Sequence, residues 1–132
     1  MMWREISLRT GRRVELIDIT KQVKETAAGS GVRDGICSVF VPHTTAGIII
    51  NEAADPDVAA DILTALELMA PDCPYRHREG NSRAHIQASL MGSSVSIPLI
   101  EGRLALGAWQ GIFFGEFDGP RHRRVMVACA PA

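Results

Sequence analysis

Two histidines eight residues apart, His77 and His85, flank the carboxylate of Glu79 in the stretch HREGNSRAH. A third histidine, His43, ends a strand-like run in VPHTTAG. Neutral imidazole is a common metal ligand and general base. Three imidazoles from separate segments, with an open coordination position, are typical of a catalytic divalent-metal site. We therefore expect His43, His77 and His85 to bind a metal ion, with Glu79 and His85 as the acid–base groups.

Simpler interpretations of the same histidines stay open. Their spacing is not a fixed zinc signature such as HExxH, so it does not decide the chemistry by itself. His43 would also serve as a strand-end histidine bonded to the backbone. His85 would equally be an ordinary helical histidine in a helix capped by Asn81.

The start of the helix that carries His85 offers a second kind of chemistry. Gly80, Asn81 and Ser82 present unpaired backbone N–H groups at a positive helix end, and Arg83 follows them. Such an arrangement binds phosphate or carboxylate. The alternative is an ordinary helix cap beside a solvated arginine.

Two further groups are candidates for substrate or anion binding. Arg121 and Arg123 alternate in DGPRHRR, so both would lie on one strand face and fork onto an anion. Alternatively, they would make the edge of the strand basic, which prevents aggregation by strand-to-strand pairing. Asn51 and Glu52 precede the helix cap at Asp55 but do not occupy capping positions, which leaves them free to contact a substrate.

The elements that must position these residues follow from periodicity. Polar–apolar alternation over residues 4–18, interrupted by Thr-Gly, predicts a hairpin. A short helix follows, capped by Asp18 or Thr20 and buried through Ile19, Val23 and Ala27. Residues 35–43 and 46–52 then read as strands.

The clearest helix starts at Asp55, with Pro56 at its first position. Its buried stripe is expected to be Val58, Ile62, Leu66 and Met69. A second, largely buried helix runs through residues 82–92, and only strands follow. This order predicts an α+β fold in which two or three helices pack on a mostly antiparallel sheet.

Composition limits the class of protein. With 132 residues, 46% of them apolar, the chain is expected to form one domain over residues 1–132. A net charge of −1 argues against nucleic-acid partners. We expect no membrane span and no signal peptide. Three widely spaced cysteines without a CxxC favour the cytoplasm.

Several common functions lack their signature in this sequence. There is no GxGxxG or GxxxxGK[ST] loop, so a nucleotide-binding fold is not indicated. No GxSxG elbow or Ser-His-Asp order is present either, which argues against a serine hydrolase.

Taken together, several segments identify a family. HTTAG, DPDV, HREGNSRAH, GAWQ and EFDGPR, spread over nearly the whole chain, resemble the YjbQ family. The resemblance implies a barrel-like α+β fold and a homotrimer. It also implies that His43, His77 and His85 line a polar pocket that holds a divalent metal such as zinc, manganese or magnesium. The family pattern has an acidic residue where this chain has Arg83. A positive charge at this position favours binding of an anion over binding of a metal ion.

The resemblance also implies a reaction, weak or secondary in the family: thiamine-phosphate synthesis. Hydroxymethylpyrimidine pyrophosphate is joined to thiazole phosphate, and pyrophosphate is released. Gly80, Asn81, Ser82, Arg83 and Arg121 would then bind phosphate. Two alternatives remain: a non-catalytic trimer that binds a metal or small anion, and a metal-dependent hydrolase of a phosphorylated metabolite.

Overall fold

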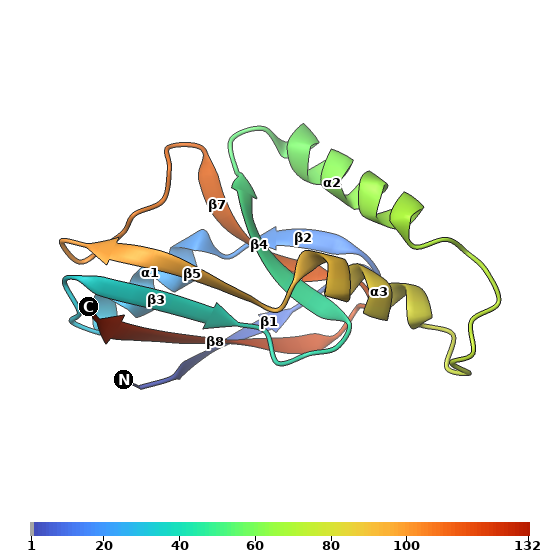
Figure 1. Cartoon of the computed structure of the whole chain (residues 1–132), viewed down its shortest axis with the longest axis horizontal. Coiled ribbons are helices and arrows are strands. Elements are labelled where there is room, and N and C mark those ends of the chain that lie inside the picture. Colours follow the sequence, from blue (N-terminus) through green and yellow to red (C-terminus); the bar gives the residue numbers. More distant parts are fainter. Residues whose placement is uncertain (1) are drawn as a thin grey trace.

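The computed structural model describes residues 2–132, which form eight strands and three helices (Figure 1). The helices are α1 (Thr20–Gly29), α2 (Pro56–Met69) and α3 (Ser82–Met91). The strands are β1 (Arg4–Arg9), β2 (Glu15–Asp18), β3 (Gly35–Phe40), β4 (Ala46–Glu52), β5 (Ser94–Ile100), β6 (Arg103–Leu104), β7 (Gln110–Glu116) and β8 (His122–Pro131).

The strands form two sheets. Five strands pair in the order β1-β8-β3-β5-β6, and three pair in the order β2-β7-β4. Every neighbouring pair is antiparallel. In Figure 1 the smaller sheet crosses over the larger one, which gives the curved, barrel-like arrangement. The prediction of an α+β fold with a mostly antiparallel sheet is therefore confirmed.

The main core lies between the two sheets. Because side chains alternate along a strand, each strand sends every second residue into this space. Val39 from β3, Val127 from β8 and Phe114 from β7 are fully buried there. Helix α1 joins this core through Ile19, which precedes it, and through Val23. The apolar spacing predicted for this helix is thus confirmed.

Helices α2 and α3 build a second, smaller core on the other side of the β2-β7-β4 sheet. Leu66 of α2, with Ala84 and Ala88 of α3, packs against Phe117. The C-terminal end of α3 lies very close to the sheet: a Cβ on Gly47 of β4 would come within 2.7 Å of the Gly92 carbonyl oxygen. This glycine therefore allows α3 to approach β4, and that contact forms the candidate site.

The hairpin expected over residues 4–18 is wrong. β1 pairs with β8 and β2 pairs with β7, so the two strands belong to different sheets. The intervening chain crosses between the sheets, where the Glu15 carboxylate accepts hydrogen bonds from the backbone N–H groups of Gly11 and Arg12. Alternation predicts a strand but not its partner, because the partner is chosen by packing over long sequence distances.

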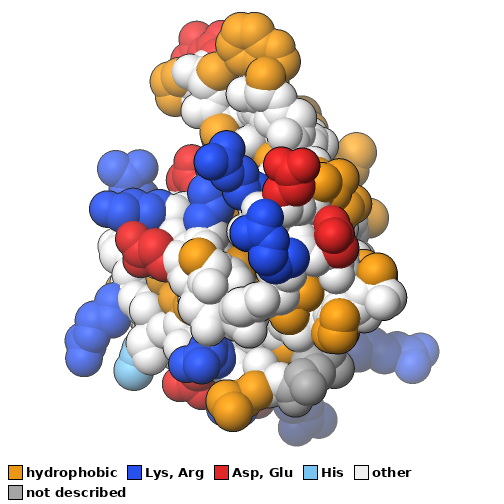
Figure 2. Space-filling model, turned by 90° about the vertical axis from the view of Figure 1, so that its left-hand side faces the viewer, with side chains coloured by type: hydrophobic (Ala, Val, Ile, Leu, Met, Phe, Trp, Pro, Cys, Tyr) orange, Lys and Arg blue, Asp and Glu red, His pale blue; other side chains and the backbone are white. Residues whose placement is uncertain are grey.

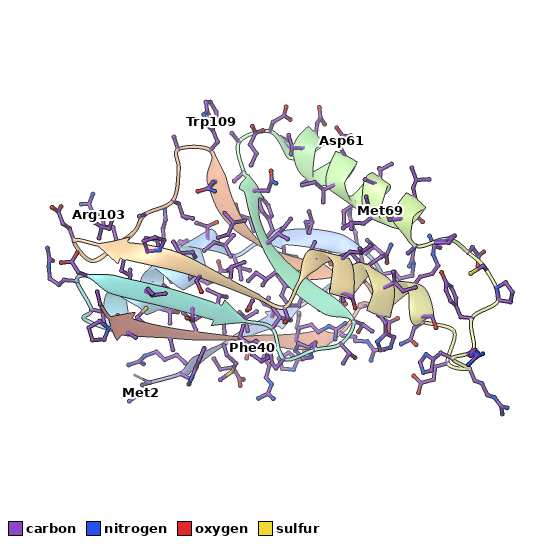
Figure 3. The ribbon with its side chains drawn as sticks, viewed as in Figure 1. Met2, Phe40, Asp61, Met69, Arg103 and Trp109 are labelled. Carbon is purple, nitrogen blue, oxygen red and sulfur yellow. The ribbon has the colours of Figure 1, made fainter. Side chains whose placement is uncertain are left out.

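One residue of the predicted buried stripe of α2, and one apolar residue of the helix expected to be largely buried, are exposed. Met69, at the end of α2, is 63% exposed, whereas Leu66 one turn earlier is buried (Figure 3). Leu90 of α3 is 54% exposed, although Ala84 and Ala88 of that helix are buried. Each helix contacts the sheet through one narrow face, and these residues lie outside it.

The caps agree with the sequence at α2 and differ at α1. At α1 no side-chain hydrogen bond comes from the cap residue Ile19; the Asp18 carboxylate instead accepts from the N–H and hydroxyl of Thr20. At α2 the Asp55 carboxylate accepts from the N–H of Asp57 at 2.9 Å, and Pro56 is the first helical residue.

Asp55→Ala should lower the free energy of unfolding by about 1 kcal/mol, because the first turn of α2 loses its side-chain acceptor. Urea denaturation followed by circular dichroism measures this value. Asp61→Ala, at an exposed position inside the same helix, is the matched control and should change stability by less than about 0.5 kcal/mol. An equal decrease in the free energy of unfolding in the two variants would contradict the stabilising role of the Asp55 cap.

No helix within residues 2–132 combines the length and apolar character that a membrane crossing requires. On the face in Figure 2, basic and acidic side chains lie among one another, and that face has no continuous basic field. This mixture agrees with the net charge of −1.

Candidate functional site

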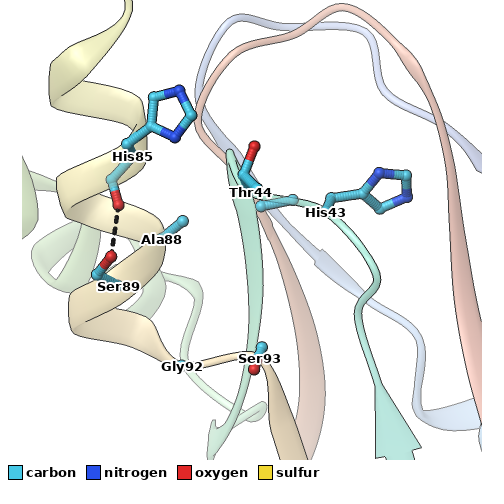
Figure 4. A pocket seen from close by; sticks show the side chains of 8 residues that line it. His43, Thr44, His85, Ala88, Ser89, Gly92 and Ser93 are labelled. Atoms are coloured by element: carbon cyan, nitrogen blue, oxygen red, sulfur yellow. Dashed lines mark hydrogen bonds between the residues drawn. The ribbon is translucent and has the colours of Figure 1, made fainter.

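A cavity of about 480 Å³ lies between α3 and the turn that connects β3 to β4 (Figure 4). The turn supplies His43 and Thr44, and α3 supplies His85 and Ser89. Ser93, just after α3, completes the polar lining. We call this cavity the hydroxyl pocket, because three hydroxyl groups line it together with two imidazoles.

His43 is fixed by β8. Its Nε2 accepts a hydrogen bond from the backbone N–H of Arg124 at 3.0 Å, so Nε2 carries no proton and only Nδ1 remains free. Burial lowers the pKa of His43 below its usual 6.5, and the positive charge of Arg123 lowers it further. His43 is therefore a neutral imidazole bonded to the backbone, as one of the simpler interpretations expected.

A buried ion pair lies behind this turn. Glu116, at the end of β7, is 0% exposed, and its two carboxylate oxygens accept from Nε and Nη2 of Arg123 on β8. The Thr10 hydroxyl donates to the same carboxylate at 2.7 Å. Arg123 also donates to the hydroxyl of Thr45 at 2.8 Å and to its carbonyl oxygen. Consecutive residues of β8, Arg123 and Arg124, thus hold both ends of the His43–Thr45 turn.

The carboxylate of Glu116 is ionised. Burial alone would raise its pKa, but the hydrogen bonds from Arg123 and Thr10 outweigh burial and keep the pKa below its usual 4.5. The same balance holds at Asp118, where hydrogen bonds from Asn81 and Arg121 lower the pKa. Sequence reasoning assigned no role to Glu116. One signal was present: Glu116 shares a strand face with the apolar Ile112 and Phe114, so it predicts a buried carboxylate that needs a partner.

His77 and His85 are neighbours, as their spacing predicted. Their ring centroids are 5.5 Å apart with the rings nearly perpendicular. His77 lies in the segment between α2 and α3, and its Nε2 is 3.9 Å from a carboxylate oxygen of the exposed Glu79. Glu79 therefore lies beside His77 on the exposed side of that ring, and it stays a predicted acid–base group.

The predicted three-histidine metal site is not assembled within one chain. Residues 2–132 contain no group of three or more His, Cys, Asp or Glu side chains placed to hold a metal ion. His77 and His85 touch, whereas His43 faces β8 and is bonded there. The metal site stays a prediction.

All three arginines predicted to bind an anion have partners within the chain, and for Arg123 these are Glu116 and Thr45. Arg83 donates through Nε to the Ala70 carbonyl oxygen at 2.6 Å and through Nη2 to that of Glu67 at 3.1 Å. These carbonyls belong to the end of α2, so Arg83 ties α3 to α2. Arg121 donates to the backbone carbonyl and carboxylate of Asp118.

The other predicted anion-binding residues lie in two places. Gly80, Asn81 and Ser82 are at the start of α3, where Gly80 has a φ of +83° and Asn81 donates to the Asp118 carboxylate. Asn51 and Glu52 are at the far end of β4, five and six residues from Ala46. At about 3.3 Å per residue they lie roughly 17–20 Å along the strand from Ala46, which lines the hydroxyl pocket. The chain does not bring them to the histidines.

Residues 4–132, nearly the whole chain, match the family model described as UPF0047 protein YjbQ-like. The chain belongs to the YjbQ family. Curated YjbQ-family relatives agree with this assignment. A UPF0047 protein of Methanocaldococcus jannaschii is 50% identical over 121 residues, covering 91% of this chain and 88% of the relative. The UPF0047 protein YugU of Bacillus subtilis is 45% identical over 128 residues, covering 96% and 97%.

Solved structures of the YjbQ family show the same fold. A family protein of Clostridium acetobutylicum, described as uncharacterised, superposes with a TM-score of 0.94 at 56% identity over 96% of this chain and 99% of that one. A YjbQ-like protein of unknown function from Sulfolobus solfataricus gives a TM-score of 0.95 at 37% identity, covering 99% and 97%. The family and its fold are thereby established for this chain.

Proposed function

We propose that this YjbQ-family chain is a transferase of the thiamine-phosphate synthase type that works in the hydroxyl pocket. It would join hydroxymethylpyrimidine pyrophosphate to thiazole phosphate, weakly or as a side activity. The observation that carries the proposal is that His43 and His85, from different elements, line one cavity together with the hydroxyls of Thr44, Ser89 and Ser93.

The chemistry of the reaction matches this lining. One C–N bond forms between the pyrimidine methylene carbon and the thiazole nitrogen, and the C–O bond to pyrophosphate breaks. Negative charge grows on the departing pyrophosphate, and hydrogen-bond donors fixed in place stabilise such charge. The hydroxyl groups of Thr44 and Ser93 would supply those donors, since the Ser89 hydroxyl donates to the backbone carbonyl oxygen of His85 at 2.8 Å. The side chain of His85 would supply a hydrogen bond or proton to the leaving oxygen.

The proposal extends to assembly and location. A cytoplasmic homotrimer is supported by exposed apolar side chains on the outer face of the larger sheet, where Trp3, Phe40 and Met126 line a hollow. Such a surface suits contact with another copy of the chain. Cys37, Cys73 and Cys129 are free thiols, as expected in a reducing compartment.

A kinetic assay with both phosphorylated substrates tests the function. Thiamine phosphate and pyrophosphate should appear in equal amounts, above an enzyme-free blank, with zinc, manganese or magnesium added singly to protein stripped of metal. No product under any of these conditions would refute the transferase proposal. Phosphate release from a single phosphorylated substrate would favour the hydrolase instead. Ligand binding with no turnover of any kind would favour the non-catalytic binding protein.

A further inference from the structure

His85 lines a second cavity besides the hydroxyl pocket. This second cavity also has a volume of about 480 Å³, and it is lined by Tyr75, Arg76, His77, Ser82, His85 and Ile86. We call it the ring pocket. Since His85 belongs to the lining of both cavities, it lies at the wall between them.

The ring pocket is built from one helix face and one loop. Ser82, His85 and Ile86 are three and four residues apart on α3, so they share a face of the helix. Tyr75 and His77 come from the segment between α2 and α3. The Tyr75 hydroxyl donates to the carbonyl oxygen of Pro71, four residues earlier in the same segment.

The lining of the ring pocket differs in chemistry from that of the hydroxyl pocket. Tyr75, His77 and His85 are planar rings, and Ile86 adds an apolar side chain. His77 and His85 already pack edge to face at 5.5 Å, a geometry that aromatic rings favour. Arg76 is the one cation in the lining. A planar ring with a negatively charged substituent matches this combination.

An adjoining small cavity lengthens the ring pocket toward the start of α3. Its volume is about 260 Å³, and Tyr75, His77 and Ser82 line both cavities. Gly80, Arg83 and Asp72 contribute to its lining, so it is more polar than the ring pocket. There is therefore room for a ring and for a polar substituent beside it.

We propose that the ring pocket binds a planar aromatic ring with an anionic substituent, so that His85 lies between two ligands held in separate cavities. This inference rests on the proposed function for its second ligand, the pyrophosphate-bearing one in the hydroxyl pocket. It makes the site a two-substrate site, with the acid–base group at the boundary of the two cavities.

Isothermal titration calorimetry with phenyl phosphate and methyl phosphate tests the ring pocket. Wild-type protein should bind phenyl phosphate about tenfold more tightly, because only this probe carries a ring to pack against Tyr75 and His77. Tyr75→Leu should abolish that preference. Tyr75→Phe should keep it, because the ring remains although the hydrogen bond to Pro71 is lost. Trp109→Leu makes the same type of change at an aromatic residue 67% exposed elsewhere, and should also keep the preference (Figure 3).

Competition then separates the two cavities. Saturating pyrophosphate should change the phenyl phosphate affinity by less than about threefold if the two ligands occupy different cavities. If Tyr75→Leu fails to fold, as judged by circular dichroism, Ile86→Ala replaces it and should weaken the ring preference. Equal binding of the two probes by wild type, a preference that survives in Tyr75→Leu, or displacement by pyrophosphate would each overturn the inference. Ring binding without turnover would refute only the proposed function, and turnover without ring preference only this inference.

Discussion

Arg123→Met should lower the free energy of unfolding by about 3–5 kcal/mol, because it leaves the buried Glu116 carboxylate without its counter-charge. Both side chains are almost completely enclosed, with exposed fractions of 5% for Arg123 and 0% for Glu116. The variant also loses the hydrogen bonds that Arg123 donates to the hydroxyl and carbonyl oxygen of Thr45. Urea denaturation at one fixed protein concentration measures the loss.

The double variant Arg123→Met/Glu116→Met distinguishes the ion pair from simple packing. Removing both charges takes away the unpaired carboxylate, so this variant should be more stable than Arg123→Met alone, although Thr10 and Thr45 still lose partners. Arg124→Met, which removes an exposed cation from the next position of β8, is the matched control and should change stability by less than about 1 kcal/mol. If Arg123→Met were as mild as Arg124→Met, the buried pair would not have the role given to it.

The effect of Arg123→Met should depend on pH in a defined direction. The folded-state pKa of Glu116 lies below 4.5, so wild type has this stabilisation above pH 4.5 and loses it as the pH falls through the folded-state pKa. In Arg123→Met, burial without a counter-charge raises the pKa of Glu116, so this variant is destabilised as the pH rises. The difference in stability between the two proteins should therefore shrink from pH 7 to pH 4.

Local signals predicted most of the secondary structure. The order of helices and strands follows from periodicity, and Asp55 and Pro56 start α2 as their residue types indicate. The pairing of β1 and β2 was wrong, since Arg4 finds its partner Val127 at the other end of the chain. The prediction paired each strand with its nearest neighbour in sequence. In the structure, the packing of the two sheets pairs β1 with β8 and β2 with β7 instead. That the chain is one domain stays a prediction.

The site could be predicted only where its parts are close in sequence. His77 and His85 meet because a short loop and one helical turn bring them together. Spacing alone does not show which way a ring faces, so it could not show that His43 is bonded to Arg124. The hydrogen bond between Thr10 and Glu116 joins residues 106 positions apart, and no sequence motif predicts such a contact.

His85→Gln should lower kcat for thiamine-phosphate formation by about 10²- to 10⁴-fold with little change in KM, because glutamine keeps polar contacts but cannot transfer a proton. Glutamine is a good helix former, so α3 should be retained, which circular dichroism checks. Steady-state kinetics on both substrates measure the effect. This prediction rests on the position of His85 at the wall between the two cavities.

His77→Gln is the matched control for His85→Gln, because it changes the same residue type in the ring that packs against His85. His77 lines only the ring pocket and its polar extension, so its replacement should raise the KM of the ring-bearing substrate and lower kcat by less than about tenfold. A metal site shared by the two histidines predicts a different result: both variants would lose activity to the same extent, and both would lose bound metal when measured by mass spectrometry. Unequal losses with unchanged metal content would therefore assign the chemistry to the imidazole of His85 itself.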